Sequence, residues 1–184
     1  MFPRALARPL ILLLLVASTS AHSGPETSIP PGWTSFESTA GRFRAAFPGT
    51  PVETTETRDT IVGNLKGYRF EVEDKDSGTF FLVEYRDLPG VATFFMSDDS
   101  LVRQASESLL EYAPSTTHKD EPSDFLGKKS RFLRFQLADE TKQIRLAQVI
   151  LVEKRLYLVI AGVPPTSSQE KLAAEFIASF EFWE

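Results

Sequence analysis

The sequence contains no cysteine and two histidines among its 184 residues. Without cysteine there is no disulfide, no thiolate metal ligand and no cysteine nucleophile. His22 precedes the expected domain, so His118 alone could serve a Ser-His-Asp triad, and no Gly-x-Ser-x-Gly turn accompanies it. We therefore predict a fold that is held together by burial, with no catalytic, cofactor-binding or metal-binding residues and no enzymatic activity.

Two short motifs are better explained by local structure than by chemistry. Ser168 and Lys171 match the Ser-x-x-Lys pattern, in which a lysine activates a serine, but they fall where a helix is expected to begin. Asp74 and Asp76 open a segment that resembles a calcium-binding loop, but Tyr85 stands where the bidentate glutamate belongs. A hairpin turn is the favoured interpretation, and weak calcium binding by the two aspartates stays open.

The balance of charge is acidic, with 25 Asp and Glu against 20 Lys and Arg. Nucleic acids and anionic lipids both require a concentrated positive face, so neither is expected as the main partner. The densest basic cluster alternates along a predicted strand and is typical of its solvated side. It consists of Lys128, Lys129, Arg131 and Arg134.

Residues 1–21 have the pattern of an export signal. Arg4 and Arg8 make the start positive, Leu10–Ala17 is an unbroken apolar run, and Ser18–Ala21 supplies small side chains for cleavage. A helix that spans a bilayer needs about 20 apolar residues, so this run is too short. We predict a secreted or periplasmic protein without a transmembrane segment in its mature chain. The alternative is an uncleaved signal that tethers the protein; a lipoprotein anchor is excluded because it requires cysteine.

The remaining chain is expected to form one domain. Residues 22–32 are polar, contain three prolines and predict a flexible spacer. Residues 33–184 then have a length that suits a single α+β domain. Turn residues bound a series of predicted strands. These are Trp33–Phe36, Arg42–Phe47, Val52–Thr60, Asn64–Glu73, Thr79–Arg86, Ser115–Asp120, Lys129–Leu137, Ile144–Val152 and Leu156–Val163.

Two segments have helical spacing. Ser97 is a suitable N-cap for a helix that ends before Pro114. Near the C-terminus, Ser167 and Glu170 predict a capping box that opens a second helix, with a buried stripe that runs to Phe180.

Two of the predicted strands are apolar on both faces, namely Phe80–Tyr85 and Leu156–Val163. Such strands must be covered on both faces, and the short turns between neighbours imply antiparallel pairing. We therefore predict an antiparallel sheet flanked by helices on both faces, an α/β/α sandwich, in a monomer. The alternative places both helices on one face and a dimer partner on the other.

A curious stretch, Asp87–Met96, joins a predicted strand to the first helix as a loop. It contains two adjacent aromatic residues and a methionine, Phe94, Phe95 and Met96. These side chains either fill the core at the edge of the sheet or form an exposed apolar patch that docks a partner or a lipid.

Several segments spread over the domain carry a family resemblance. They are Trp33, Gly41–Phe43, Phe47–Pro51, Tyr85–Pro89, Arg155–Leu158 and Phe176–Phe180. Together they resemble bacterial secreted proteins of the PsbP-like group, whose fold is similar to that of the PsbP subunit of photosystem II and of a yeast nuclear import factor that binds the GTPase Ran. The resemblance implies an antiparallel sheet between helices and a non-enzymatic accessory or binding role. It carries over no functional residue.

The expected function is that of an exported, non-catalytic accessory or binding protein of the bacterial cell envelope. Its partner would be a protein or a small apolar ligand. One alternative is a carrier that holds an apolar ligand or a lipid between sheet and helix, which an enclosed apolar cavity would favour. Another is a small envelope hydrolase that uses carboxylates or a serine without histidine, which a large polar pocket would favour.

Overall fold

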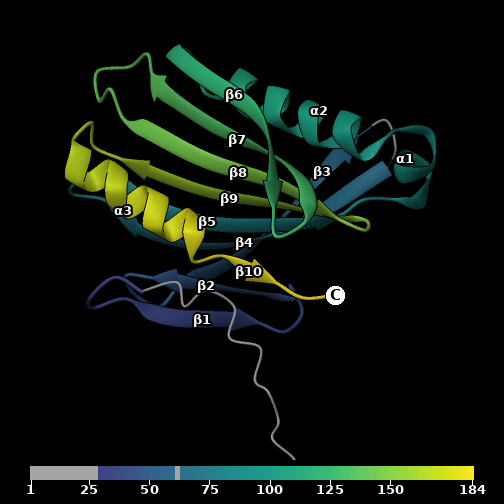
Figure 1. Ribbon diagram of the computed structural model, residues 1–184, viewed down its shortest axis with the longest axis horizontal. Coiled ribbons are helices and arrows are strands. Elements are labelled where there is room, and N and C mark those ends of the chain that lie inside the picture. The colour runs from purple at the N-terminus through teal and green to yellow at the C-terminus, as the bar shows by residue number, and fades with distance from the viewer. Residues whose placement is uncertain (1–28, 61–62) are drawn as a thin grey trace, which may run out of the picture.

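The computed structural model describes residues 29–60 and 63–184, which form two antiparallel sheets and three helices (Figure 1). The predicted export signal, residues 1–21, and most of the predicted spacer lie outside the described residues. None of the helices in the described part of the chain combines the length and the apolar character that crossing a membrane requires.

The larger sheet has seven strands in the order β3-β4-β5-β9-β8-β7-β6, and every neighbouring pair is antiparallel. The predicted antiparallel pairing is therefore confirmed. The pairing of β5 with β9 joins an N-terminal group of strands to a C-terminal meander. The strands are β3 Val52–Thr60, β4 Gly63–Asp74, β5 Thr79–Asp87, β6 Ser115–Phe125, β7 Lys128–Leu137, β8 Ile144–Val152 and β9 Arg155–Val163.

A second sheet of three strands has the order β1-β2-β10. It contains β1 Thr34–Ser38, β2 Phe43–Phe47 and the short C-terminal strand β10 Glu181–Phe182. We expected a single sheet, and that expectation is wrong. Pro48 and Pro51 lie between β2 and β3 and cannot donate hydrogen bonds to a sheet. Strands β1 and β2 are therefore separate from the larger sheet, and their third strand is β10.

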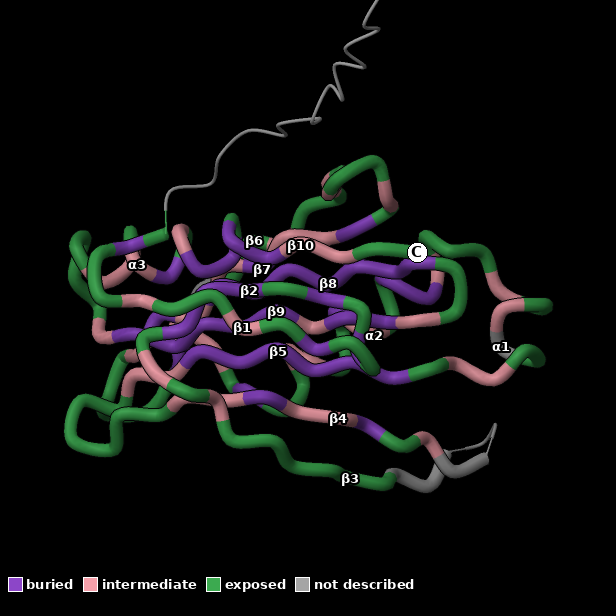
Figure 2. Tube along the Cα trace, turned by 90° about the horizontal axis from the view of Figure 1, so that it is seen from below, coloured by how far each residue is buried: buried purple, intermediate pink, exposed green. Residues whose placement is uncertain are grey.

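One hydrophobic cluster lies between the larger sheet, the small sheet and helix α3, Ser167–Ala178. Figure 2 shows the small sheet in front of the larger one, with α3 beside it. The rings of Phe43 and Phe180 stack at 5.8 Å, and Phe47 meets Phe176 of α3 edge to face at 5.2 Å. Burial of aromatic side chains thus contributes much of the stability of this fold, which has no disulfides.

A second cluster contains the remaining side chains of the central strands together with helix α2, Asp98–Glu111. Along β8, Leu146 and Ile150 belong to the first cluster, whereas Ala147 and Val149 belong to the second. Because successive side chains of a strand point to opposite faces, β8 is buried on both. Helix α2 contacts β7 and β8.

The predicted start of α2 is confirmed, and the predicted capping box of α3 is wrong. Ser97 caps α2 by accepting a hydrogen bond from the Ser100 amide at 3.3 Å. For α3 the N-cap is Thr166. Glu170 instead pairs with Arg134 of β7, at 2.5 Å and 3.1 Å. Because the helix is capped one residue earlier than predicted, Gln169 and not Glu170 occupies the capping-box position. The hydrogen bonds from Arg134 lower the pKa of Glu170.

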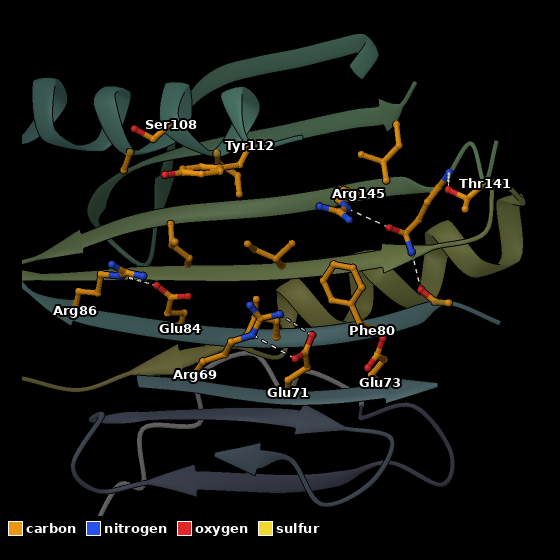
Figure 3. A pocket seen from close by; sticks show the side chains of 18 of the residues that line it. Arg69, Glu71, Glu73, Phe80, Glu84, Arg86, Ser108, Tyr112, Thr141 and Arg145 are labelled. Carbon is orange, nitrogen blue, oxygen red and sulfur yellow. Dashed lines mark hydrogen bonds and ion pairs between the residues drawn. The ribbon is translucent and has the colours of Figure 1, made fainter. Parts of the chain in front are cut away.

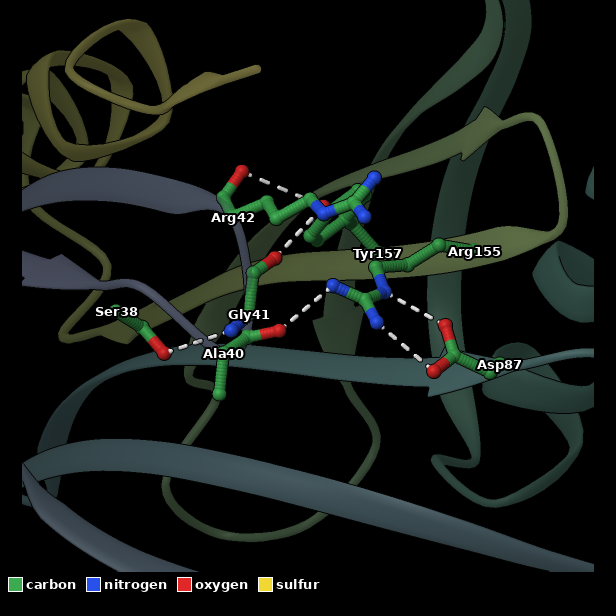
Figure 4. Close-up of polar contacts among 7 residues, drawn as sticks. All are labelled: Ser38, Ala40, Gly41, Arg42, Asp87, Arg155 and Tyr157. Atoms are coloured by element: carbon green, nitrogen blue, oxygen red, sulfur yellow. Dashed lines mark hydrogen bonds and ion pairs between the residues drawn. The ribbon is translucent and has the colours of Figure 1, made fainter. Parts of the chain in front are cut away.

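A polar network fastens the β1–β2 turn to the larger sheet (Figure 4). Arg155, at the start of β9, pairs with both oxygens of Asp87 at 2.6 Å and 2.8 Å, and it donates a further hydrogen bond to the Ala40 carbonyl at 2.8 Å. The Tyr157 hydroxyl donates to the Gly41 carbonyl at 2.8 Å. Hydrogen bonding to Asp87 raises the pKa of Arg155, and burial raises the pKa of Tyr157, so both groups remain donors at neutral pH.

Replacing Arg155 with alanine should therefore weaken the attachment of the small sheet. The side chain of Asp87 is 61% exposed, which reduces the value of the ion pair, so we expect R155A to lower the free energy of unfolding by about 1–2 kcal/mol. Urea unfolding followed by circular dichroism measures this. The control K119A removes a pair between exposed side chains, Lys119 and Glu121, and should cost less than about 0.5 kcal/mol. Equal losses in the two variants would contradict the role of the network.

Candidate functional site

The part of the larger sheet that α2 leaves uncovered forms a partly open cleft of about 600 Å³. Its lining comes from α2 on one side and from strands β4, β5, β9 and β8 on the other, as Figure 3 shows. Ligand pockets in proteins have volumes of about 300–1,000 Å³, so the cleft is large enough for a small molecule.

The part of the floor that β9 supplies is apolar, and the helical wall is apolar in part. Leu156, Leu158 and Ile160 are alternate residues of β9 and point to the same face. Ala105 and Leu109 of α2 lie beside them. With a rise of about 3.3 Å per residue, the β9 residues form an apolar run about 13 Å long.

The opposite side of the cleft carries two arginine–glutamate pairs, together with Glu73, which forms no ion pair among the described residues. Arg69 donates to both oxygens of Glu71 on β4, at 2.8 Å and 3.2 Å. On β5 the buried Arg86 donates to the buried Glu84 at 2.5 Å. Gly67 lies opposite Arg86, and a Cβ atom there would come within 3.0 Å of the guanidinium. The absence of a side chain at Gly67 thus makes room for the buried ion pair.

Arg145 of β8 lies at one end of the cleft in a different environment. Its Nε donates to the Gln143 side chain at 3.0 Å, and its guanidinium lies over the ring of Phe80 at 5.2 Å. It forms no ion pair with any carboxylate of the described residues. Burial lowers the pKa of Arg145, Asp139 raises it in part, and Arg69 lowers it further. An arginine still keeps its proton at neutral pH.

The residues that the sequence analysis weighed for catalysis or metal binding do not line the cleft. His118 is exposed on the edge strand β6. No group of three metal-ligating side chains occurs in the parts of the chain that the structure describes. Of the acidic residues that line the cleft, Glu71 and Glu84 are each engaged by an arginine, whereas Glu73 and Asp139 form no ion pair among the described residues.

The aromatic pair singled out in the sequence lies outside the cleft, on helix α1, Gly90–Phe95, which we had expected to be a loop. Phe94 is 81% exposed and Phe95 is 77% exposed, and their rings meet edge to face at 5.0 Å. These two rings therefore do not fill the core. Met96 is half-buried and packs against the cluster below α2. Phe94 and Phe95 are thus exposed, whereas Met96 contacts the core.

The other sequence motifs have local structural roles. Asp74 accepts hydrogen bonds from the Asp76 amide at 3.1 Å and from the Ser77 hydroxyl at 2.7 Å, inside the β4–β5 hairpin turn. The bond from Ser77 lowers the pKa of Asp74. Ser168 and Lys171 lie in the first turns of α3. Lys171 there faces Glu175 at 3.6 Å, one helical turn further on.

The sequence analysis missed the residues at the end of the cleft. Two signals were present in the strands. Arg145 is the charged residue in β8, whose other residues are apolar except Gln148, and Gly162 interrupts an apolar run in β9. An isolated charge or an isolated glycine in a buried strand indicates a special environment. Neither signal reveals by itself that the two residues are neighbours.

No protein-family model matches this sequence, and a comparison with curated proteins also finds no match. Among solved structures, the chain is similar to the solution structure of the cyanobacterial PsbP protein CyanoP from Synechocystis sp. PCC 6803. The TM-score is 0.53 at 11% sequence identity, over 82% of this chain and 92% of that chain. A likeness at this identity concerns the fold alone. The chain has a PsbP-like fold.

Proposed function

We propose that this chain is an exported, non-catalytic binding protein of the bacterial cell envelope and that the cleft beside α2 is its ligand site. The observation that carries the proposal is the cleft of about 600 Å³, with its apolar floor on β9 and its charged side chains on β4, β5 and β8. Concave sites that combine an apolar surface with placed polar groups are typical of small-molecule binding, and about half of the residues that line this cleft are polar or charged.

The proposal includes a finer description of the fold. Helices α2 and α3 cover opposite faces of the larger sheet in an α/β/α arrangement, and the small sheet shares the face of α3. In support of this, the α2 residues belong to one hydrophobic cluster and the α3 residues to the other. A helix is narrower than a seven-stranded sheet. The uncovered half of the α2 face is then the ligand site.

Filling the cleft should abolish ligand binding without unfolding the protein. Ser108 is exposed on α2 and lines the cleft, whereas its exposed neighbour Glu107 does not. We expect the wild type to bind an uncharged solvatochromic dye such as Nile red saturably, and S108W to bind it at least about 10-fold more weakly, because the indole occupies the cleft. Fluorescence titration measures the affinities.

The control variant E107W adds the same side chain outside the cleft and should bind the dye as the wild type does. Thermal melts of both variants report whether the fold is intact. The proposal fails if the wild type does not bind the dye, or if the two tryptophan variants bind it equally well.

A second candidate function is the docking of a protein partner at helix α1. The exposure of Phe94 and Phe95 favours it, because large aromatic side chains are enriched at protein interfaces and rarely lie exposed side by side.

Serine at both positions, F94S/F95S, should then leave the melting temperature within about 1 °C of the wild type, because little buried area is lost. Calorimetry measures this. A fall of several degrees would assign the rings to the core and remove the docking candidate. With the fold intact, a docking role further requires that the double variant lose a partner that the wild type retains in the native envelope.

Export itself can be tested at the N-terminus of the protein. If residues 1–21 form a cleaved signal, mass spectrometry of the native protein should find a mature chain that begins at or near His22. A native protein that retains Met1 would contradict the secreted location.

A further inference from the structure

Three charged side chains that line the cleft form no ion pair among the described residues, namely Arg145, Glu73 and Asp139, and Arg145 is the cation among them. Among the described residues, Arg145 has no carboxylate partner, and its terminal nitrogens donate no hydrogen bond; Nε alone is engaged, by Gln143. Asp139 acts on Arg145 from a distance, while its own carboxylate accepts two hydrogen bonds from Thr141, at 2.5 Å and 3.1 Å. A half-buried cation with free donors is a preformed site for an anion.

The ring of Phe80 lies against the guanidinium of Arg145 and restricts its position. Phe80, Gly162 and Arg145 are register partners across β5, β9 and β8. A Cβ atom on Gly162 would lie 2.2 Å from the Phe80 ring, so the glycine leaves the space that the ring occupies. The guanidinium of Arg145 then lies over that ring, at 5.2 Å (Figure 3). A cation that stacks on an aromatic face keeps its planar edge available for a ligand.

The surrounding charges restrict the kind of anion. A guanidinium fork matches a carboxylate group with two parallel hydrogen bonds. The other two arginines of the cleft, Arg69 and Arg86, are already paired with glutamates. Glu73 and Asp139 also line the cleft, and they oppose a doubly charged anion about twice as strongly as a singly charged one. The site therefore suits a head group with a single charge.

The apolar run of the cleft begins where Arg145 sits. Gly162 is the partner of Arg145, and the next residues of β9 on that face are Ile160, Leu158 and Leu156. A ligand whose head contacts Arg145 would extend along these side chains, beside Ala105 and Leu109 of α2. The run is straight and about 13 Å long, which suits a linear chain better than a branched or a ring-shaped body.

We infer that the cleft binds monocarboxylates with an unbranched apolar chain, with the head at Arg145 and the chain along β9. This inference rests on the proposed function and names the class of its ligand.

The test compares two probes that differ in charge and share the same chain, decanoate and decanol. Calorimetric titration of the full chain, below the aggregation concentration of either probe, should give about 10-fold tighter binding of decanoate by the wild type. R145Q should lose this preference and keep its affinity for decanol. R145K should keep part of the preference, because it retains the charge without the fork. The control R103Q removes an exposed arginine of α2 outside the cleft and should behave as the wild type does.

The outcomes distinguish a failure of the monocarboxylate inference from a failure of the proposed binding site. Equal affinity of the wild type for the two probes overturns the monocarboxylate inference and leaves the cleft as an apolar binding site. Binding of Nile red without binding of either probe overturns it as well. A loss of decanol affinity in R145Q as large as the loss of decanoate affinity would show that Arg145 only shapes the cleft. If neither Nile red nor the probes bind, the proposed function fails together with the inference.

Discussion

Strands β8 and β9 carry apolar side chains on both faces, and the need to keep both faces from water determines most of the fold. Helix α3 and the small sheet contribute to a core that is rich in phenylalanine. Helix α2 contributes to a second cluster that includes Leu156 and Ile160 of β9. Leu158 and Ile160 also line the cleft beside α2, together with the ion pairs of β4 and β5. In the proposed function, a ligand would complete the cover of this apolar surface.

The segments that carry the family resemblance are distant in sequence and meet in space. Gly41, Asp87, Arg155 and Tyr157 come from three different segments, and all four take part in the network that fastens the β1–β2 turn. Phe43, Phe176 and Phe180 fill the core beneath it. Three residues of these segments, Arg86, Leu156 and Leu158, also line the cleft, and the rest of its lining comes from other parts of the chain. The resemblance therefore covers the fold and only a small part of the cleft.

Local signals predicted the elements well, and the site depended on features that are not local. The bounds of Val52–Thr60 and Ile144–Val152 coincide with the predicted strands, because proline, glycine and charged turns bound them. Strand β10 is too short to have a periodicity, and α1 follows Pro89 within a segment too short to show a helical pattern. The cleft arises from the width of α2 relative to the sheet.

The sequence of α2 alone does not predict how much of the larger sheet this helix covers. In the same way, the placement of Arg145 over Phe80 depends on the register of three strands.

The closure of the small sheet has a consequence for the order in which the molecule assembles. Strand β2 receives its second neighbour from β10, and the ion pair between Arg44 and Glu181 joins residues 137 positions apart. Contacts between such distant residues form slowly, because a long loop must close first. When the chain leaves a ribosome or a translocation pore with its N-terminus first, residues up to β10 must emerge before β10 can pair with β2.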